Sequence, residues 1–289
     1  MLRARGNVVF DIFNYLFVGV LALLCLYPLW DTLMLSLSTP VNAMRLGVRF
    51  FTSPITFDSY GVIFSSQILA VAYYNSILRT VAGTAVTLLV TYCAGYALAR
   101  ADLPFRKSIT ALVVFTMFFN GGLVAIYLNI LQLGLMNSRW ALILPLATSA
   151  WNLLIARNFL MALPRELEDA ALADGAHPLR IVFSIMFPIS TPVLAVLALW
   201  TAVMHWNAWF DALLYMREES KVVLQILLRR LTVEEYEIAR RPFLLETRGT
   251  TTPSIRAGTI IVTIGPIILM YPFLQRYFVK GILIGSLKG

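Results

Sequence analysis

The chain has 289 residues, of which 59% are hydrophobic and only 13% are charged, and its formal net charge is +8. A soluble globular domain is nearer half apolar and a quarter charged, so this composition excludes an ordinary soluble domain. The basic residues are not clustered on one face with interleaved aromatic residues, which argues against nucleic-acid binding.

Six apolar runs have the length of a membrane-crossing helix, which is about 20 residues for a hydrocarbon core of about 30 Å. They lie at about 12–37, 74–99, 108–131, 139–162, 189–214 and 257–279. The sequence therefore predicts an all-α integral membrane protein with six transmembrane helices. We expect a single transmembrane domain over 1–289, with its core at about 70–280. The long first run predicts a retained helix rather than a cleaved signal peptide.

The short loops predict the orientation in the membrane. Basic residues precede the first run, separate the second from the third, and follow the sixth: Arg3, Arg5, Arg100, Arg106, Lys107, Arg276, Lys280 and Lys288. Since such residues mark the cytoplasmic side, we expect both chain termini there. The loop at about 38–73 is then external, and its turn signals predict short helices.

A second external loop, at about 215–256, carries eight basic and six acidic residues, which weakens it as an orientation signal. Leu224, Leu227, Leu228 and Leu231 have helical spacing. Two interpretations stay open for this segment. The helix packs on the membrane or on its own spans, or it meets a soluble external partner.

Polar and aromatic side chains inside the spans are candidates for a translocation pathway, because polar groups there usually face the bundle interior or water. The candidates are Asn120, Asn152, Trp206, Asn207, Trp209, Asp211 and Arg79. The alternative is that the tryptophans and Asp211 are interface anchors. Arg79 and Arg157 are expected to snorkel, although Arg79 could attract a polyanionic substrate. His205 is expected to form hydrogen bonds within the bundle.

The segment 163–188, between the fourth and fifth runs, has the composition of a soluble surface. Pro164 can start a helix, its first turn holds Glu166, Glu168 and Asp169, and Gly175 suits the position after its end. Pro178 can start a second helix that Pro188 ends. We expect small or apolar faces made by Leu163, Leu167, Ala170 and Ala171, and by Ile181, Val182, Ile185 and Met186. The pattern predicts a two-helix corner on the cytoplasmic face, although a plain solvated loop is the alternative.

The stretch "DAALADGAHPLRIVFSIMFPISTP" resembles the EAA motif of permease subunits of binding-protein-dependent ABC importers. Ala170, Ala171, Asp174, Gly175, Ala176 and Pro188 match the motif, whereas Asp169 stands where the family usually has Glu. The resemblance implies that this loop is a coupling helix that docks in a cleft of a cytoplasmic ATPase subunit. The implied docking residues are Glu168, Asp169, Ala170, Ala171, Asp174, Gly175, Ala176 and His177.

The rest of the chain is similar to the maltose-permease-like branch, in "LSLSTP", "FFNGGLVAIYLNILQLGLMNSRWALILP", "HWNAWFDALLY" and "LQRYFVKGILIGSLKG". Within it, a subgroup linked to complex oligosaccharides, including uronic-acid polymers such as alginate, is the most similar. The resemblance implies the type I ABC importer permease fold in a bacterial cytoplasmic (inner) membrane. It also implies three partners: a second homologous permease subunit, two ATPase copies, and an external solute-binding protein.

The chain has no GxxxxGK[ST] loop, so ATP and Mg are expected to bind to the partner ATPase and not to this chain. His177 and His205 lie far apart without a neighbouring metal-ligand pattern, so we expect no catalytic residues, metal or cofactor here. Two other classes of protein fit the sequence less well. A self-contained secondary transporter or channel would leave the EAA-like loop unexplained, and a membrane-embedded enzyme would need a catalytic set that is not apparent.

Overall fold

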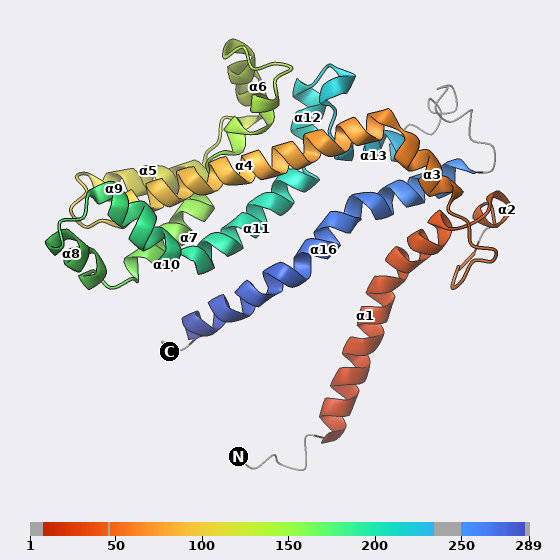
Figure 1. Ribbon diagram of the computed structural model, residues 1–289, viewed down its shortest axis with the longest axis horizontal. Coiled ribbons are helices and arrows are strands. Elements are labelled where there is room, and N and C mark those ends of the chain that lie inside the picture. Colours follow the sequence, from red (N-terminus) through yellow and green to blue (C-terminus); the bar gives the residue numbers. More distant parts are fainter. Residues whose placement is uncertain (1–7, 46, 234–249, 287–289) are drawn as a thin grey trace. The chain divides into compact units, whose positions relative to one another are not determined.

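A computed structural model describes residues 8–45, 47–233 and 250–286 of the chain (Figure 1). The basic residues Arg3, Arg5 and Lys288, and part of the loop predicted at 215–256, lie outside these residues. The chain is divided into two compact units. One consists of residues 1–69 and 228–265, and the other of residues 70–227 and 266–289.

Three helices of the described residues are long and apolar enough to cross a membrane without interruption. They are α1 (Val8–Ser36), α4 (Gln67–Ala99) and α16 (Thr252–Ser286). They correspond to the predicted first, second and sixth spans. The predicted fold class, an all-α membrane protein, is therefore confirmed.

The other candidate spans are bent pairs of helices, and counting each pair as one span gives up to six in the described part of the chain. The pairs are α5 (Arg106–Phe118) with α6 (Gly122–Gln132), bent by 112°; η2 (Arg139–Leu142) and η3 (Leu144–Leu146) with α7 (Ala150–Met161), bent by 50°; and Pro178–Ile189 with α11 (Thr191–Asn207), bent by 78°.

The third predicted span is therefore interrupted, the fourth is bent, and the fifth is shorter than predicted. The third breaks at Asn120-Gly121-Gly122, where the Asn120 side chain accepts a hydrogen bond from the amide of Gly122 at 3.0 Å. Such an Asx turn competes with helix continuation. The fifth stops at Asn207, and a separate short helix, α12 (Phe210–Tyr215), follows.

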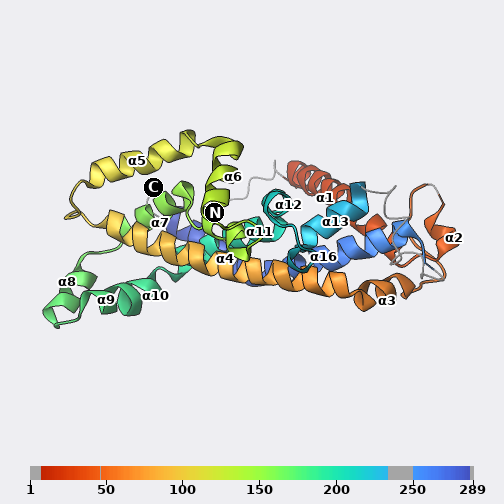
Figure 2. The same ribbon diagram turned by 90° about the horizontal axis from the view of Figure 1, so that it is seen from above.

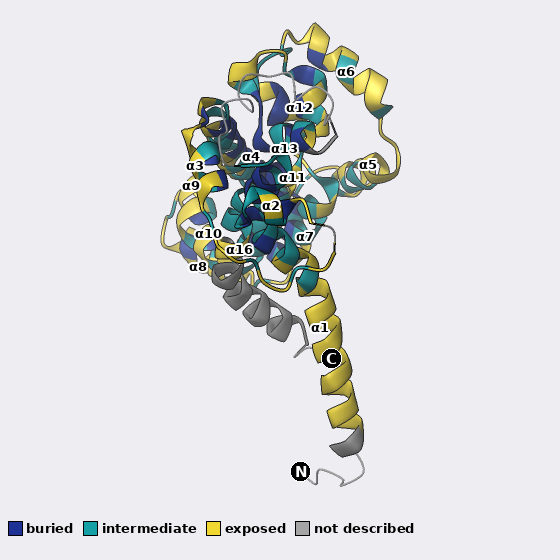
Figure 3. Ribbon diagram, turned by 90° about the vertical axis from the view of Figure 1, so that its right-hand side faces the viewer, coloured by how far each residue is buried: buried dark blue, intermediate teal, exposed yellow. Residues whose placement is uncertain are grey.

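The first unit contains α1, α2 (Pro40–Ala43), α3 (Asp58–Ser65) and the first part of α16. The short helices α2 and α3 lie in the loop at 38–73, as predicted. The hydroxyl groups of Ser36 and Tyr60 are 2.8 Å apart and join the end of α1 to α3. The most apolar stretch of α1 has no buried residue, and Figure 3 shows this helix exposed along most of its length. An all-round apolar helix of this kind is typical of a membrane span.

The second unit is built around α4. Figure 1 shows α11 beside α4, and the close approach occurs where His205 lies over Gly83. A β-carbon at Gly83 would lie only 2.5 Å from His205 Nε2, so a glycine is needed for this crossing. The helices α8, α9 and α10 lie at one end of α4, and α12 lies toward the other, as both Figure 1 and Figure 2 show.

Around the α12 end, a hydrophobic cluster holds the connecting segments together. It contains Ile130, Leu142, Tyr215, Val223 and Ile226, among others. It includes residues of η2 and of α13 (Leu224–Val233), and η5 (Glu219–Lys221) lies in the loop between α12 and α13. The predicted helical spacing in 224–231 is confirmed, and Leu224 and Leu231 are buried within the described chain. This packing favours the first of the two interpretations of that segment.

Candidate functional site

The helix corner, residues 163–188, begins with α8 (Glu166–Ala173). The helix ends in a Schellman motif: the Gly175 amide donates to the carbonyl oxygen of Leu172 and the Ala176 amide to that of Ala171, both at 3.0 Å. Gly175 has a φ of +74°, which a residue with a side chain rarely adopts. The prediction that Gly175 ends the first helix is confirmed.

The chain then turns into a second helical stretch, made of α9 (Pro178–Arg180), the π-helix η4 (Ile181–Met186) and α10 (Phe187–Ile189). His177 begins it, because its Nδ1 accepts a hydrogen bond from the Leu179 amide at 3.3 Å. The wide π-turn ends two residues before Pro188, whose ring nitrogen has no hydrogen to donate to the preceding turn. The stretch ends one residue after Pro188, close to the predicted end.

One side of the helix corner packs into the protein. Ala171, Ile181 and Met186 are buried together, and Tyr96 and Leu163 pack against them. A solvated loop would not bury these side chains, so the alternative of a plain loop is wrong. The predicted apolar face of the second helix is confirmed, since Val182 and Ile185 also pack against buried clusters.

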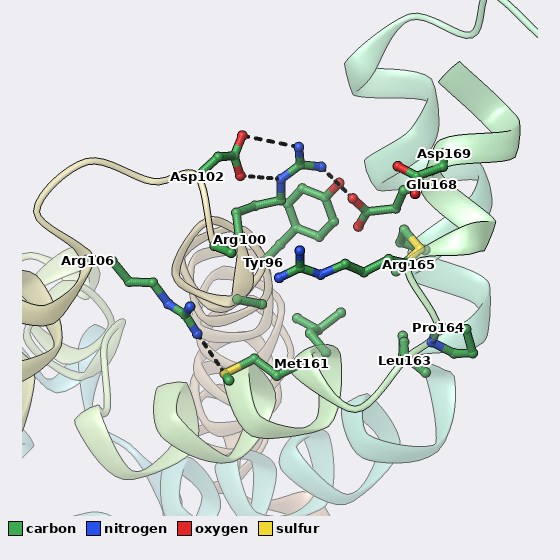
Figure 4. Close-up of a pocket in the computed structure, with 14 residues that line it drawn as sticks. Tyr96, Arg100, Asp102, Arg106, Met161, Leu163, Pro164, Arg165, Glu168 and Asp169 are labelled. Atoms are coloured by element: carbon green, nitrogen blue, oxygen red, sulfur yellow. Dashed lines mark hydrogen bonds and ion pairs between the residues drawn. The ribbon is translucent and has the colours of Figure 1, made fainter. Parts of the chain in front are cut away.

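A group of charged side chains joins the helix corner to the end of α4 (Figure 4). Arg100 follows the last residue of α4, and its Nη1 forms an ion pair with Glu168 on α8. Its Nε also donates to Asp102 Oδ1 at 3.1 Å. This contact is the main cause that raises the pKa of Arg100, and it lowers the pKa of Asp102. The contacts lie beside a hollow of about 260 Å³ that is also lined by Arg165 and Asp169.

The other side of the helix corner is exposed. Of the predicted docking residues, Asp169, Ala170, Asp174, Gly175 and His177 are exposed, whereas Ala176 is half-buried and Glu168 and Ala171 are turned toward the protein. Three leucines outside the predicted docking set are also exposed in the helix corner: Leu167 at 38%, which was predicted only as part of an apolar face, Leu172 at 48% and Leu179 at 62%. Their position on a polar helical corner is the signal that could have identified them, since exposed apolar groups there suit a protein contact.

Among the predicted pathway residues, Arg79 and Asp211 form an ion pair between α4 and α12. Arg79 Nη1 also donates to the carbonyl oxygen of Ala208, at the break between α11 and α12, with a distance of 3.0 Å. The side chain of Arg79 is only 2% exposed, so the prediction that it snorkels is wrong. The reason is that Asp211 offers a partner inside the protein, which satisfies the charge without reaching bulk water.

The remaining pathway candidates fall into separate places. Trp206 is buried and its ring meets that of Tyr73 edge-on, with centroids 5.9 Å apart. Trp209 is more exposed and lies in the α11–α12 break. The Asn207 side chain donates to the carbonyl oxygen of Val203 at 3.0 Å. The α11–α12 break therefore gathers Arg79, Trp209 and Asp211 but not Asn120, which lies at the α5–α6 break.

Two further predicted side chains are Asn152, which lies on α7 and contacts α11, and His205, which lies on α11 itself. The Asn152 side chain donates to Thr201 Oγ1 at 3.5 Å. His205 is 1% exposed, and neither of its ring nitrogens has a hydrogen-bond partner among the described residues. The expectation that His205 forms hydrogen bonds is wrong for this conformation. Its ring instead fills the space over Gly83 that the missing side chain leaves open.

No family model matches the chain. The chain is 37% identical to the polygalacturonan/rhamnogalacturonan transport system permease protein YtcP of Bacillus subtilis (strain 168), over 98% of this chain and 99% of that protein. It is 28% identical to the arabinooligosaccharides transport system permease protein AraQ of the same organism, over 95% and 94% of the two chains. It also matches a chain in the crystal structure of a bacterial ABC transporter involved in the import of the acidic polysaccharide alginate. That match has a TM-score of 0.90 and 30% identity, and it covers 96% of this chain and 99% of the other.

Proposed function

The chain belongs to the permease subunits of ABC sugar importers, and we propose that it serves an acidic oligosaccharide in a bacterial cytoplasmic membrane. As a member of this family it is a multi-pass transmembrane subunit of an ATP-driven importer. It supplies half of the translocation pathway. The rival class, a self-contained channel or secondary transporter, is not favoured by these relatives.

The proposed partners are a second permease subunit, two copies of a cytoplasmic ATPase and an external binding protein. The exposed side of the helix corner, with Leu167, Asp169, Leu172, Asp174 and Leu179, is the proposed surface for the ATPase. Apolar side chains ringed by charged ones suit such a contact. Both chain termini then lie on the cytoplasmic side with the helix corner.

The proposed mechanism is a shift between two conformations of the whole assembly. ATP binding closes the ATPase dimer, and it changes the access of the pathway only if it favours one conformation over the other. The helix corner is the part of this chain that receives that movement. ATP and Mg are bound by the ATPase partner, and this chain supplies only the contact surface and the spans.

The names of the relatives support an acidic substrate. The permease that is 37% identical serves polygalacturonan or rhamnogalacturonan, and the importer of known structure serves alginate. Arg79, the predicted attractor of a polyanion, is paired with Asp211, so its charge is already neutralised here. Carboxylates of the sugar would therefore be met by other groups of the assembly, such as the binding protein or the second permease.

The single observation that carries the function is the likeness of the whole chain to oligosaccharide permeases. The test is the ATPase activity of the reconstituted complex with its binding protein. We expect stimulation by oligogalacturonates or alginate oligomers and little by neutral arabinooligosaccharides. Stimulation by the neutral sugars alone would contradict the acidic substrate, and transport without any ATPase would contradict the importer class.

The docking role has its own test in Asp174, an exposed residue at the end of α8. Asp174→Arg should uncouple ATP hydrolysis from transport while the subunit still inserts, because a long cation then occupies the proposed contact. Asp174→Asn is the matched control, since it keeps the size of the residue and leaves its backbone contacts at the helix end in place. Normal transport by the Asp174→Arg complex would contradict docking at this surface.

A further inference from the structure

We propose that Glu168 is a positioning residue within this chain and not an ATPase contact. Together with Arg100 and Asp102 it forms a latch that fixes the orientation of α8 on the end of α4. The inference rests on the proposed docking function of the helix corner, and it assigns to Glu168 a different role from that of its neighbours Asp169 and Asp174. It also gives Arg100 and Asp102 a role in coupling.

The contacts of Glu168 point away from a docking surface. Its side chain is only 16% exposed, and a carboxylate oxygen is held by Arg100 Nη1. Asp169, the next residue, is exposed, borders the same hollow, and makes no contact with Arg100 that resembles that of Glu168. Figure 4 shows Arg100 between the carboxylates of Asp102 and Glu168, with the ring of Tyr96 beside them.

Arginine suits this position because its guanidinium has several donors in a fixed plane. Nη1 donates a hydrogen bond to Glu168. Nε and Nη2 donate to the two carboxylate oxygens of Asp102, at 3.1 and 3.3 Å. A lysine has one nitrogen and would not hold both carboxylates in the same geometry. The latch therefore depends on the shape of the guanidinium as well as on its charge.

The need for a latch follows from how little else holds α8. The helix has eight residues, and Ala171 is its only buried residue among those described. A short helix attached through one methyl group can swivel about that point. Glu168 lies three residues earlier, hence on the same face, and gives a second point of attachment. Two points fix the direction in which α8 presents its exposed side.

The latch also connects the helix corner to a long rigid element. From Arg100 to Arg79 the chain runs along α4 for 21 residues, or about 32 Å at the usual helical rise. At the far end, Arg79 contacts Ala208 and Asp211 at the α11–α12 break. A displacement of α8 that is transmitted through the latch thus reaches the break where several pathway candidates lie.

The test uses Arg100→Gln, Glu168→Gln and the double variant in the reconstituted complex with its ATPase and binding protein. The readouts are transported sugar per ATP hydrolysed and the affinity of the ATPase for the permease pair. We expect each single variant to lower transport per ATP by about five-fold or more, a typical coupling between sites. The double variant should be no worse than either single one. ATPase affinity should stay unchanged in all three.

The matched control is Glu166→Gln, which removes a charge from the same first turn of α8 at an exposed position outside the latch. This variant should transport as much sugar per ATP hydrolysed as the wild type does. If Arg100→Gln fails to insert because a basic loop residue is lost, Arg100→Lys keeps the charge and should still lower the ratio.

Three results would overturn the latch. Glu168→Gln could weaken ATPase binding while Arg100→Gln does not, which would make Glu168 a docking contact. The two single effects could multiply in the double variant, or none of the variants could change the ratio. Failure of the proposed function looks different, because the wild-type complex itself would then show no sugar-stimulated ATPase activity.

Discussion

Asp211→Asn is expected to destabilise the protein strongly, because it removes the charge that compensates Arg79. The guanidinium of Arg79 is 2% exposed, and its Nε has no hydrogen-bond partner among the described residues, so its pairing depends on Asp211 and the carbonyl oxygen of Ala208. Removing one member of a buried ion pair costs about 3–5 kcal/mol. Asp211 is itself 22% exposed, so some water can replace it, which favours the lower end of that range.

A loss of about 3 kcal/mol changes the unfolding equilibrium by about a hundred-fold. The assay is the resistance of the purified subunit to unfolding by heat or SDS, read as loss of the monodisperse species. Arg79→Met combined with Asp211→Asn should be more stable than Asp211→Asn alone, since no buried charge is then left unpaired. Asp58→Asn, at an exposed helix start, should cost less than about 1 kcal/mol.

Two results would contradict a buried, charge-compensating pair: Asp211→Asn as stable as the wild type, or the double variant less stable than Asp211→Asn alone. The first result would mean that water or the Ala208 carbonyl satisfies Arg79 without Asp211. The second would mean that Arg79 has favourable contacts beyond this pair.

Gly83→Ala should destabilise the protein by about 1–3 kcal/mol in the same unfolding assay, because the added methyl would overlap the buried ring of His205. Adding His205→Ala should recover part of that lost stability. If it recovered none, the close packing of His205 over Gly83 would be contradicted. Gly175→Ala should cost about 1 kcal/mol from its left-handed backbone alone, since a β-carbon there meets no atom within 4 Å; a loss above about 3 kcal/mol would contradict this. Arg100 holds the pKa of Asp102 below its ordinary 3.8. A lowered pKa gives a stabilisation that is present above the ordinary value and is lost only as the pH falls through the lowered one. The stability difference between wild type and Arg100→Gln should therefore be the same at about pH 8 and about pH 6, and a difference that shrinks at the lower pH would contradict the assignment.

Features that depend on neighbouring residues could be predicted from the sequence. The end of α8 at Gly175 and the start of the second helix at Pro178 follow from local backbone preferences. The apolar runs likewise locate the spans, because their lengths match a bilayer. The break at Asn120 was missed because hydrophobicity over the window hides a three-residue turn signal.

Features that depend on distant residues could not be predicted. Arg100 and Glu168 are separated by 68 positions, and Arg79 and Asp211 by 132. Nothing in the sequence around either arginine identifies its carboxylate partner. Arg79 was therefore predicted to snorkel and Arg100 to mark the cytoplasmic side, both from the general behaviour of arginine near a span end. The same lack of information led to the wrong expectation for His205, because its environment is set by Gly83 on another helix.

The π-turn at Ile181–Met186 has a geometric consequence for the helix corner. A π-turn holds one residue more than an α-turn, and one residue rotates a helix by about 100°. If this stretch were a regular α-helix, everything before it would be turned by that angle relative to α11. Leu179 and α8 would then present a different side outward. The single extra residue in this turn therefore determines the direction, around the helix axis, in which the exposed side of the helix corner faces. It does so whatever residues that side carries.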